Sequence, residues 1–283
     1  MKVRWSIATL VVALVVRGMC GGGGGAGPLR IATFNIENFP KHARQIDGVF
    51  DELARLDVGI VAVQEIVDHE VFAHAARERL GRDWDFVHVS TAPLGGTQHP
   101  VHHLGVLFDR AAFTLVSTEV HDDTRLVDGR HKPTFEVRLQ PTGGGTIVRV
   151  LVVHLKAGGD GREIRGRQLV ALGTIVRAAS RSGERIVLLG DFNATDDVED
   201  RRDIATLAAN TGLTWATEEL GCSAFWSRDD GCPRSRLDHV LSWTGATTVE
   251  AAGACATEGC DWQDRCPLYA DQVSDHCPVI VGF

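Results

Sequence analysis

This chain contains few tyrosines and methionines and has no excess of positive charge. It has one tyrosine and two methionines, and 29 lysines and arginines against 37 acidic residues give a formal net charge of −8. That balance excludes a protein that attracts polyanions over its whole surface. There is no internal repeat, and the one low-complexity run is the glycine stretch at 21–25. With 283 residues, 44% of them hydrophobic, the composition fits one globular domain near the upper size for a single core.

Cysteine is missing from positions 21–221. Cys20 precedes this gap, and six cysteines follow it in the last quarter of the chain: Cys222, Cys232, Cys255, Cys260, Cys266 and Cys277. An even, clustered set in an exported chain predicts disulfides, with the pairing left open. Zinc binding is the alternative, but the spacings match no common C-x-x-C site.

The amino terminus lacks an apolar run long enough to cross a membrane comfortably. The run at 5–16 follows the basic Lys2 and Arg4, as is typical of a secretory signal. Cys20, directly before the glycines, resembles the lipidated cysteine of bacterial lipoproteins, although Arg17 and Met19 depart from that pattern and simple cleavage nearby is the alternative. We expect a signal peptide at 1–20, a Gly-rich linker at 21–28 and one folded domain at 29–283 of an exported protein that is secreted, periplasmic or tethered to a membrane.

Apolar residues at helical spacing predict helices over 46–56 and 169–179. Runs rich in β-branched and aromatic residues predict strands at 86–89, 104–108, 113–120, 134–139 and 146–153. So much β-structure argues against a simple Rossmann fold.

Polar side chains recur where predicted buried strands begin or end. The residues concerned are Asn35, Glu65, His154, Asp191, Asn193, Asp275 and His276. Each alone is explained by an Asx-turn, a solvated loop or a structural histidine. Together they are not, because a packed domain has no structural reason to end strand after strand on metal-binding or acid/base groups. We expect them to converge at one rim of a sheet.

Six short motifs occur in a distinctive order: FN at 34–35, QE at 64–65, HLK at 154–156, GDFN at 190–193, LDH at 237–239 and SDH at 274–276. On these motifs the chain resembles the endonuclease/exonuclease/phosphatase superfamily over about residues 29–283. That superfamily includes deoxyribonuclease I, abasic-site endonucleases, neutral sphingomyelinases and inositol polyphosphate 5-phosphatases. The resemblance implies an α+β fold, a four-layer α/β/β/α sandwich of two mainly antiparallel sheets flanked by helices.

The resemblance implies that Asn35 and Glu65 hold a divalent cation and that Asp275 completes the metal and phosphate shell. Oxygen ligands of this kind suit Mg²⁺, Mn²⁺ or Ca²⁺. A hard cation would neutralise charge on the phosphate in an in-line attack by water.

The resemblance assigns catalytic roles to five further side chains. Asp191 and Asn193 would orient the nucleophilic water and the phosphate, and His154 would contact the scissile phosphate. His276 would be the acid/base histidine, with Asp238 on its other nitrogen to fix the tautomer and raise the pKa.

Three residues near the predicted rim are candidates for substrate binding. Lys156 lies two residues after His154, and Arg130 lies in a rim loop. His102 lies in the run 98–103, where nucleases resembling deoxyribonuclease I usually carry a tyrosine. Other rim cations, such as Lys132, are equally well explained as a solvated charged face.

The sequence therefore predicts a metal-dependent phosphoric diester hydrolase, a nuclease acting on DNA or RNA, with no obligate protein partner evident. A sphingomyelinase-like phospholipid phosphodiesterase is the alternative, for which Trp215, Phe225, Trp226 and Trp262 are candidate membrane contacts. A non-catalytic surface binding protein is a weaker alternative, because every motif residue is present. The Trp-Cys-Asp-Arg run of 5-phosphatases is absent, which counts against inositol phosphates.

Overall fold

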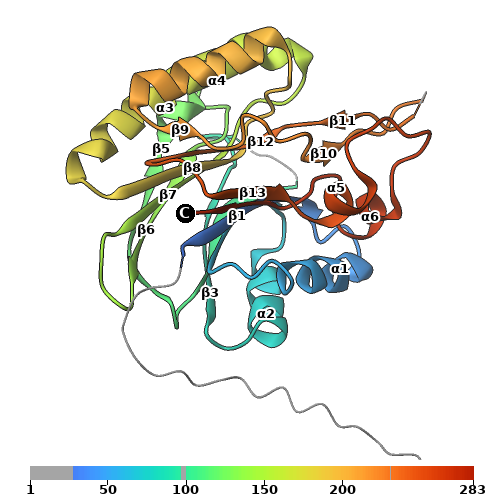
Figure 1. Ribbon diagram of the computed structural model, residues 1–283, viewed down its shortest axis with the longest axis horizontal. Coiled ribbons are helices and arrows are strands. Elements are labelled where there is room, and N and C mark those ends of the chain that lie inside the picture. The colour runs from blue at the N-terminus through green and yellow to red at the C-terminus, as the bar shows by residue number, and fades with distance from the viewer. Residues whose placement is uncertain (1–27, 97–99, 230) are drawn as a thin grey trace, which may run out of the picture.

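The computed structural model describes residues 28–96, 100–229 and 231–283. Two six-stranded sheets lie face to face, and helices cover the outer face of each sheet (Figure 1). The predicted four-layer sandwich of mainly antiparallel sheets is confirmed. The signal peptide predicted at 1–20 and the linker at 21–28, except Pro28, lie outside the described residues.

The first sheet has the strand order β13-β14-β1-β2-β4-β3. Only β1 and β2 are parallel, and every other neighbouring pair is antiparallel. The strands are β1 (Arg30–Phe39), β2 (Ile60–Ile66), β3 (Trp84–Ser90), β4 (His103–Asp109), β13 (Thr248–Ala251) and β14 (Val279–Gly282). Both faces of β1 and β2 are largely buried, which explains their nearly continuous apolar sequences.

The second sheet has the order β5-β6-β7-β8-β12-β9, in which only β7 and β8 are parallel. The strands are β5 (Phe113–His121), β6 (Thr134–Pro141), β7 (Val148–His154), β8 (Arg185–Asp191), β9 (Thr214–Trp215) and β12 (Asp238–Ser242). The edge strand β5 is mostly exposed, whereas β7 and β8 are buried in the middle.

The main core lies between the sheets and contains fully buried side chains such as Ile31, Val150 and Leu189. Helices α1 (Ala43–Leu53) and α2 (His69–Arg79) pack on the first sheet, and α3 (Arg162–Ala179) and α4 (Val198–Thr211) pack on the second, as Figure 1 shows below and above the sheets. Short 3-10 turns are η1 (Asp122–Arg125), η2 (Gly159–Gly161) and η3 (Ser180–Ser182). Among the described residues, no helix combines the length and the apolar character that a membrane span requires.

The carboxy-terminal quarter forms a cap at one end of the sandwich. It contains a two-stranded ribbon of β10 (Ala224–Phe225) and β11 (Arg234–Ser235), and two short helices, α5 (Gly253–Glu258) and α6 (Leu268–Gln272) (Figure 1). The predicted disulfides are confirmed as three bonds: Cys222–Cys260, Cys232–Cys266 and Cys255–Cys277. They link the segments of the cap to one another and to Cys277, two residues before β14.

Candidate active site

Each sheet delivers polar side chains from its parallel pair of strands to the same rim. Asn35 and Glu65 come from β1 and β2, and His154 and Asp191 end β7 and β8, where they lie opposite each other in the register. The Asn35 amide donates to Asp191 Oδ2 at 3.0 Å, so one hydrogen bond joins the two sheets. Because the carboxyl ends of parallel strands meet at one edge, this rim is where the topology concentrates functional groups.

Glu65 is held in an uncommon backbone conformation. Its φ is 62°, in the left-handed region that favours glycine. Its carboxylate accepts from the Asn35 amide at 3.4 Å and from the backbone N–H of Asn38 at 3.2 Å. Such a conformation in a non-glycine residue costs free energy and is concentrated at functional sites, where surrounding contacts hold it.

Asp191 uses one carboxylate oxygen to shape its own turn and the other to face the site. Oδ1 accepts from the backbone N–H of Asn193 at 2.8 Å, which is the Asx-turn geometry. Oδ2 lies 3.4 Å from His154 Nε2 and 3.9 Å from His276 Nε2. The Asn193 amide donates to the carbonyl of Leu155 at 3.2 Å, which ties this turn to the end of β7. The Asx-turn that Oδ1 forms therefore also holds Oδ2 near His154 and His276.

His276 and Asp238 form a buried pair. His276 Nδ1 lies 2.7 Å from Asp238 Oδ2, which also accepts from the Ser223 hydroxyl at 2.7 Å. Asp238 begins β12 directly opposite Asp191 in the antiparallel register. Burial alone lowers the pKa of His276, but the charge and hydrogen bond of Asp238, with the charges of Asp191 and Asp275, raise it well above the ordinary value. His276 is therefore protonated at neutral pH, with Nε2–H turned toward Asp191.

Two carboxyls at the rim hold protons more tightly than free carboxylates do. Burial raises the pKa of Asp191 to about 7, although the His276 charge opposes the shift. Burial raises the pKa of Asp275 to about 6, His276 opposes this, and the charges of Glu37 and Glu65 raise it further. Like charges gathered here are the environment that a hard cation would neutralise, and the donors are all oxygens. Glu65 and Asp275 thus fit Mg²⁺, Mn²⁺ or Ca²⁺, and Asn35 fits once its amide turns, because here its nitrogen faces Glu65 and Asp191 while its oxygen accepts from the backbone N–H of Glu37.

Lys132 reaches the centre of the site. Its Nζ lies 2.7 and 2.8 Å from the two ring nitrogens of His154. Burial lowers the pKa of Lys132 to about 8, against the charges of Glu65 and Asp191. Burial, followed by the Lys132 charge, lowers the pKa of His154 far below its usual value, so this ring is neutral.

The predicted substrate-binding residues occupy three different environments. His102 Nε2 lies 2.8 Å from the side-chain oxygen of Asn38, the β1 residue whose backbone N–H donates to Glu65. The Lys156 ammonium donates to the carbonyl of Ala157 at 2.7 Å on the surface. Arg130 is exposed, and its backbone N–H donates to the Asp128 carboxylate. A role in substrate binding stays a prediction for all three.

Several supporting residues were not predicted. Ser274 donates from its hydroxyl to the carbonyl of Asn35 at 2.7 Å and accepts from the backbone N–H of His276 at 3.0 Å. Glu37 accepts from the backbone N–H of Asp275 at 3.0 Å. A signal was available for both, since Ser274 is the first residue of the SDH motif and Glu37 lies two residues after Asn35.

The fold and this site define the class of protein: a sandwich that carries paired acid/base and oxygen-donor groups for phosphoester hydrolysis. The chain belongs to the Endonuclease/Exonuclease/phosphatase family, whose model matches residues 32–276. The predicted membership is confirmed, and with it the prediction of an enzyme of the phosphoester hydrolase class. A comparison with curated proteins finds no significant match.

Solved structures share the fold at low sequence identity. The human Nocturnin catalytic domain with bound sulfate is 17% identical with a TM-score of 0.69, covering 90% of this chain and 93% of that one. D. rerio TDP2 in complex with a single-strand DNA product is 14% identical with a TM-score of 0.67, covering 90% and 98%. A mannosyl-6-phosphatase of Bacteroides thetaiotaomicron is 17% identical with a TM-score of 0.60, covering 89% and 98%.

Proposed function

We propose that this protein is an exported, divalent-metal-dependent phosphodiesterase, a nuclease that hydrolyses DNA or RNA by in-line attack of an activated water. The observation that carries the proposal is the buried His276–Asp238 pair, at 2.7 Å, which faces Asp191 across the rim. A charged imidazole opposite a carboxyl of raised pKa supplies a proton donor and a proton acceptor within one small site.

In the proposed mechanism, Asn35, Glu65 and Asp275 would hold Mg²⁺, or Mn²⁺ or Ca²⁺ in its place. The bound ion would neutralise charge on the nonbridging phosphate oxygens. The side chains of Asp191, Asn193, His276 and Lys132 would bind and orient the phosphate and the water.

Asp191 and Asn193 orient the attacking water, and Asp191 accepts its proton. His276 presents Nε2–H to a phosphate oxygen, while Asp238 holds the ring in that tautomer through Nδ1. Lys132 adds a positive charge beside His154, where the phosphate would lie. In-line attack requires the water and the leaving oxygen on opposite sides of phosphorus, so the bond to the leaving oxygen breaks as the bond to the water oxygen forms. The leaving oxygen then takes up a proton from solvent.

A nucleic acid substrate is supported by an exposed aromatic side chain next to the site. Trp226 is 55% exposed and follows Phe225, whose backbone N–H donates to the carbonyl of Asp275 at 2.7 Å. An indole held there can stack on an unpaired base next to the scissile phosphate. The single-strand DNA product in the TDP2 complex is consistent with such a substrate for this fold.

A phospholipid phosphodiesterase is the second candidate, because Trp226 and Trp262 are both exposed on the cap, at 55% and 51%. Indole rings also anchor proteins at membrane interfaces. The two candidates differ in what Trp226 contacts, and this makes them separable by experiment.

Export is part of the proposal. Three disulfides support it, because such bonds persist in oxidising compartments. Cell fractionation and mass spectrometry of the mature amino terminus would test it. A diacylated Cys20 indicates a lipid tether, a free terminus near residue 20 indicates secretion, and an intact 1–20 segment in the cytoplasm would contradict export.

The activity test uses the purified protein with single-stranded DNA, duplex DNA, RNA, sphingomyelin vesicles, a bis-nitrophenyl phosphodiester and a phosphomonoester. We expect cleavage of a nucleic acid and of the small diester with Mg²⁺ or Mn²⁺, and none with EDTA. Trp226→Ala should raise KM for the nucleic acid and leave the small diester unchanged. Preference for sphingomyelin would support the second candidate, and full activity after exhaustive chelation would exclude the metal mechanism.

A further inference from the structure

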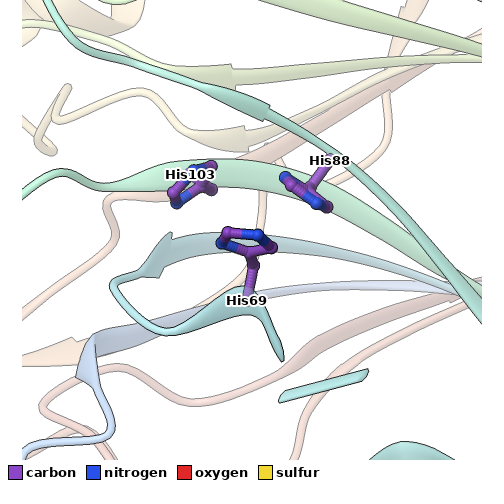
Figure 2. A group of neighbouring side chains, drawn as sticks. All are labelled: His69, His88 and His103. Atoms are coloured by element: carbon purple, nitrogen blue, oxygen red, sulfur yellow. The ribbon is translucent and has the colours of Figure 1, made fainter. Parts of the chain in front are cut away.

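Three histidines from separate elements meet outside the candidate active site. His69 is the first residue of α2, His88 lies on β3 and His103 begins β4. Figure 2 shows His88 and His103 on neighbouring strands, with the His69 ring facing both. The ring centroids are 4.1 Å apart for His69 and His88, 4.6 Å for His69 and His103, and 5.0 Å for His88 and His103. One ring nitrogen from each lies within 4.8 Å of the others.

The hydrogen bonds of this cluster leave lone pairs free. His103 Nδ1 lies 3.0 Å from the carbonyl oxygen of Ile66, and a carbonyl can only accept. Nδ1 of His103 therefore carries the hydrogen in the neutral ring, and Nε2 is left with a lone pair. A histidine that binds a metal typically donates its other ring N–H to such a carbonyl.

His88 has a buried nitrogen that the protein does not satisfy. Its Nδ1 is buried without a hydrogen-bond partner among the described residues. Burial, with the charges of His69 and His103, lowers the pKa of His88 to about 4, and burial also lowers the pKa of His103. Neutral rings do not repel a cation, but a buried polar nitrogen without a partner costs free energy.

Stacking explains only part of this arrangement. The His88 ring is stacked on Phe86, with centroids 5.4 Å apart and planes at 19°. This contact fixes the position of the ring and would be made equally well by phenylalanine. It gives no role to the nitrogens, nor to the approach of His69 from the helix.

A second group with metal-binding atoms, Glu119, His121 and Glu136, is already neutralised by the protein. Glu136 accepts from Arg149 at 2.7 Å and pairs with His121 at 2.9 Å. Within the described part of the chain, no lysine or arginine contacts the rings of His69, His88 or His103 in this way.

We propose that His69, His88 and His103 form a second metal centre, separate from the phosphodiester site, that binds a zinc-class transition metal ion. Three imidazoles select Zn²⁺, Co²⁺, Ni²⁺ or Cu²⁺ over Mg²⁺, which prefers oxygen ligands. Zinc bonds to nitrogen at about 2.0–2.1 Å, so tetrahedral ligands lie about 3.3 Å apart, a spacing that small side-chain rotations would reach here. The fourth position would be taken by water.

This centre would tie the start of α2 to the strands β3 and β4 and so stabilise the first sheet. It also adjoins the candidate active site. His102, the neighbour of His103, contacts Asn38, and the Asn38 backbone N–H donates to Glu65. Occupancy would therefore stiffen the end of β1 that positions Glu65 without supplying a ligand to the substrate.

The test is a titration of the purified protein with Zn²⁺ and with Co²⁺ in excess Mg²⁺, which occupies the oxygen-donor site. We expect one tightly bound equivalent of Zn²⁺, the strong visible absorption of four-coordinate Co²⁺, and a rise in Tm on Zn²⁺ addition. His88→Phe keeps the stacking on Phe86 and removes the nitrogens. It should weaken Zn²⁺ binding by more than the roughly 10- to 100-fold that changes beyond the ligands cause.

His74→Ala is the matched control, because His74 lies on the same helix but is exposed and pairs with Glu78 at i,i+4. This variant should bind Zn²⁺ as the wild type does. Circular dichroism of each variant checks that the fold is retained. Equal Zn²⁺ affinity and equal Tm gain in wild type and folded His88→Phe would overturn the proposal. Loss of the tight equivalent in Glu65→Gln instead would assign that ion to the phosphodiester site and equally overturn it.

Discussion

The ring of His276 lies between two buried carboxyls, with Asp238 on Nδ1 and Asp191 opposite Nε2. If this ring donates a proton or a hydrogen bond in the transition state, His276→Gln should lower kcat by about 10²- to 10⁴-fold with little change in KM. Asp238→Asn should lower kcat as well, because its side chain no longer fixes the tautomer. Steady-state kinetics with the small diester would measure both. Near wild-type turnover in a folded His276→Gln protein would reject the role of this residue.

Two lysines near His154 offer a matched comparison. The Lys132 ammonium contacts the His154 ring, whereas the Lys156 ammonium binds the carbonyl of Ala157 on the surface. We expect Lys132→Met to lower kcat/KM on the order of 10²-fold, because a positive charge is lost beside the phosphate. Lys156→Met should have a much smaller effect. A larger loss for Lys156→Met would show that its side chain moves into the site when substrate binds.

At the scale of single residues, the sequence predicted which side chains converge at the rim. It did not predict which side chains contact one another there. Glu65 and Asp191 could be selected because each follows a buried apolar run, and strand ends share a rim. Lys132 could not be ranked above other rim cations. Its contact arises because β6 lies antiparallel to β7, with Phe135 opposite Val152, so the residues before β6 reach the end of β7. The cluster of His69, His88 and His103 has no spacing signal, since three elements bring its members together.

A chain of alternating charges crosses strands β5, β6 and β7 on the second sheet. His121 pairs with Glu136, Glu136 with Arg149, and Arg149 with Glu184, which also binds Arg138. Burial opposes the shift, but the hydrogen bond and charge of Glu136 raise the pKa of His121 above its ordinary value. The His121–Glu136 pair should therefore stabilise these strands only while His121 is protonated.

The raised pKa of His121 sets the direction in which stability changes with pH. A raised folded-state pKa gives stability that is fully present below the unfolded value, about 6.5, and is lost as pH rises through the folded value. The pKa of Glu136 is lowered, as the attraction of His121 and Arg149 outweighs burial, so it stays charged in this window. Wild type should exceed His121→Gln in Tm by about 2–4 °C at pH 6, for about 1 kcal/mol, and the gap should close by pH 9. A constant gap measured by calorimetry would contradict this assignment.

Elements with strong periodicity were predicted, and two helices with few buried residues were not. The strands predicted at 86–89, 104–108 and 134–139 correspond to β3, β4 and β6, and the helices predicted at 46–56 and 169–179 correspond to parts of α1 and α3. Helices α2 and α4 were missed, because each buries only three residues. Their helical state depends on the sheet that they cover, and this is tertiary information that local patterns do not carry.

At the scale of the whole molecule, three disulfides hold the cap together. Cys277 directly follows His276 and bonds to Cys255, so this bridge limits the movement of the SDH motif. Each disulfide closes a loop whose restriction of the unfolded chain contributes about 3–4 kcal/mol. Reduction should therefore lower both Tm and activity, as measured by calorimetry and turnover with and without a reductant.

A pair of double variants would separate the two effects. Replacing Cys255 and Cys277 with alanine should lower stability and kcat together, because the bridge adjoins His276. Replacing Cys232 and Cys266 should lower stability by a similar amount, with a smaller effect on kcat, because neither cysteine is next to Ser223, Asp238 or His276 in the sequence. Unchanged kcat in the first variant would show that β14 alone holds His276 in place.

The three disulfides overlap in sequence: each bond begins before the previous one has closed, at 222–260, 232–266 and 255–277. Every peptide bond between Cys222 and Cys277 is thus spanned by at least one disulfide. A protease that cleaves any single position in the cap would leave a nicked molecule whose fragments remain covalently joined, with Asp238 and His276 still on one connected framework. Such a molecule would migrate at full length on a non-reducing gel and separate only when reduced.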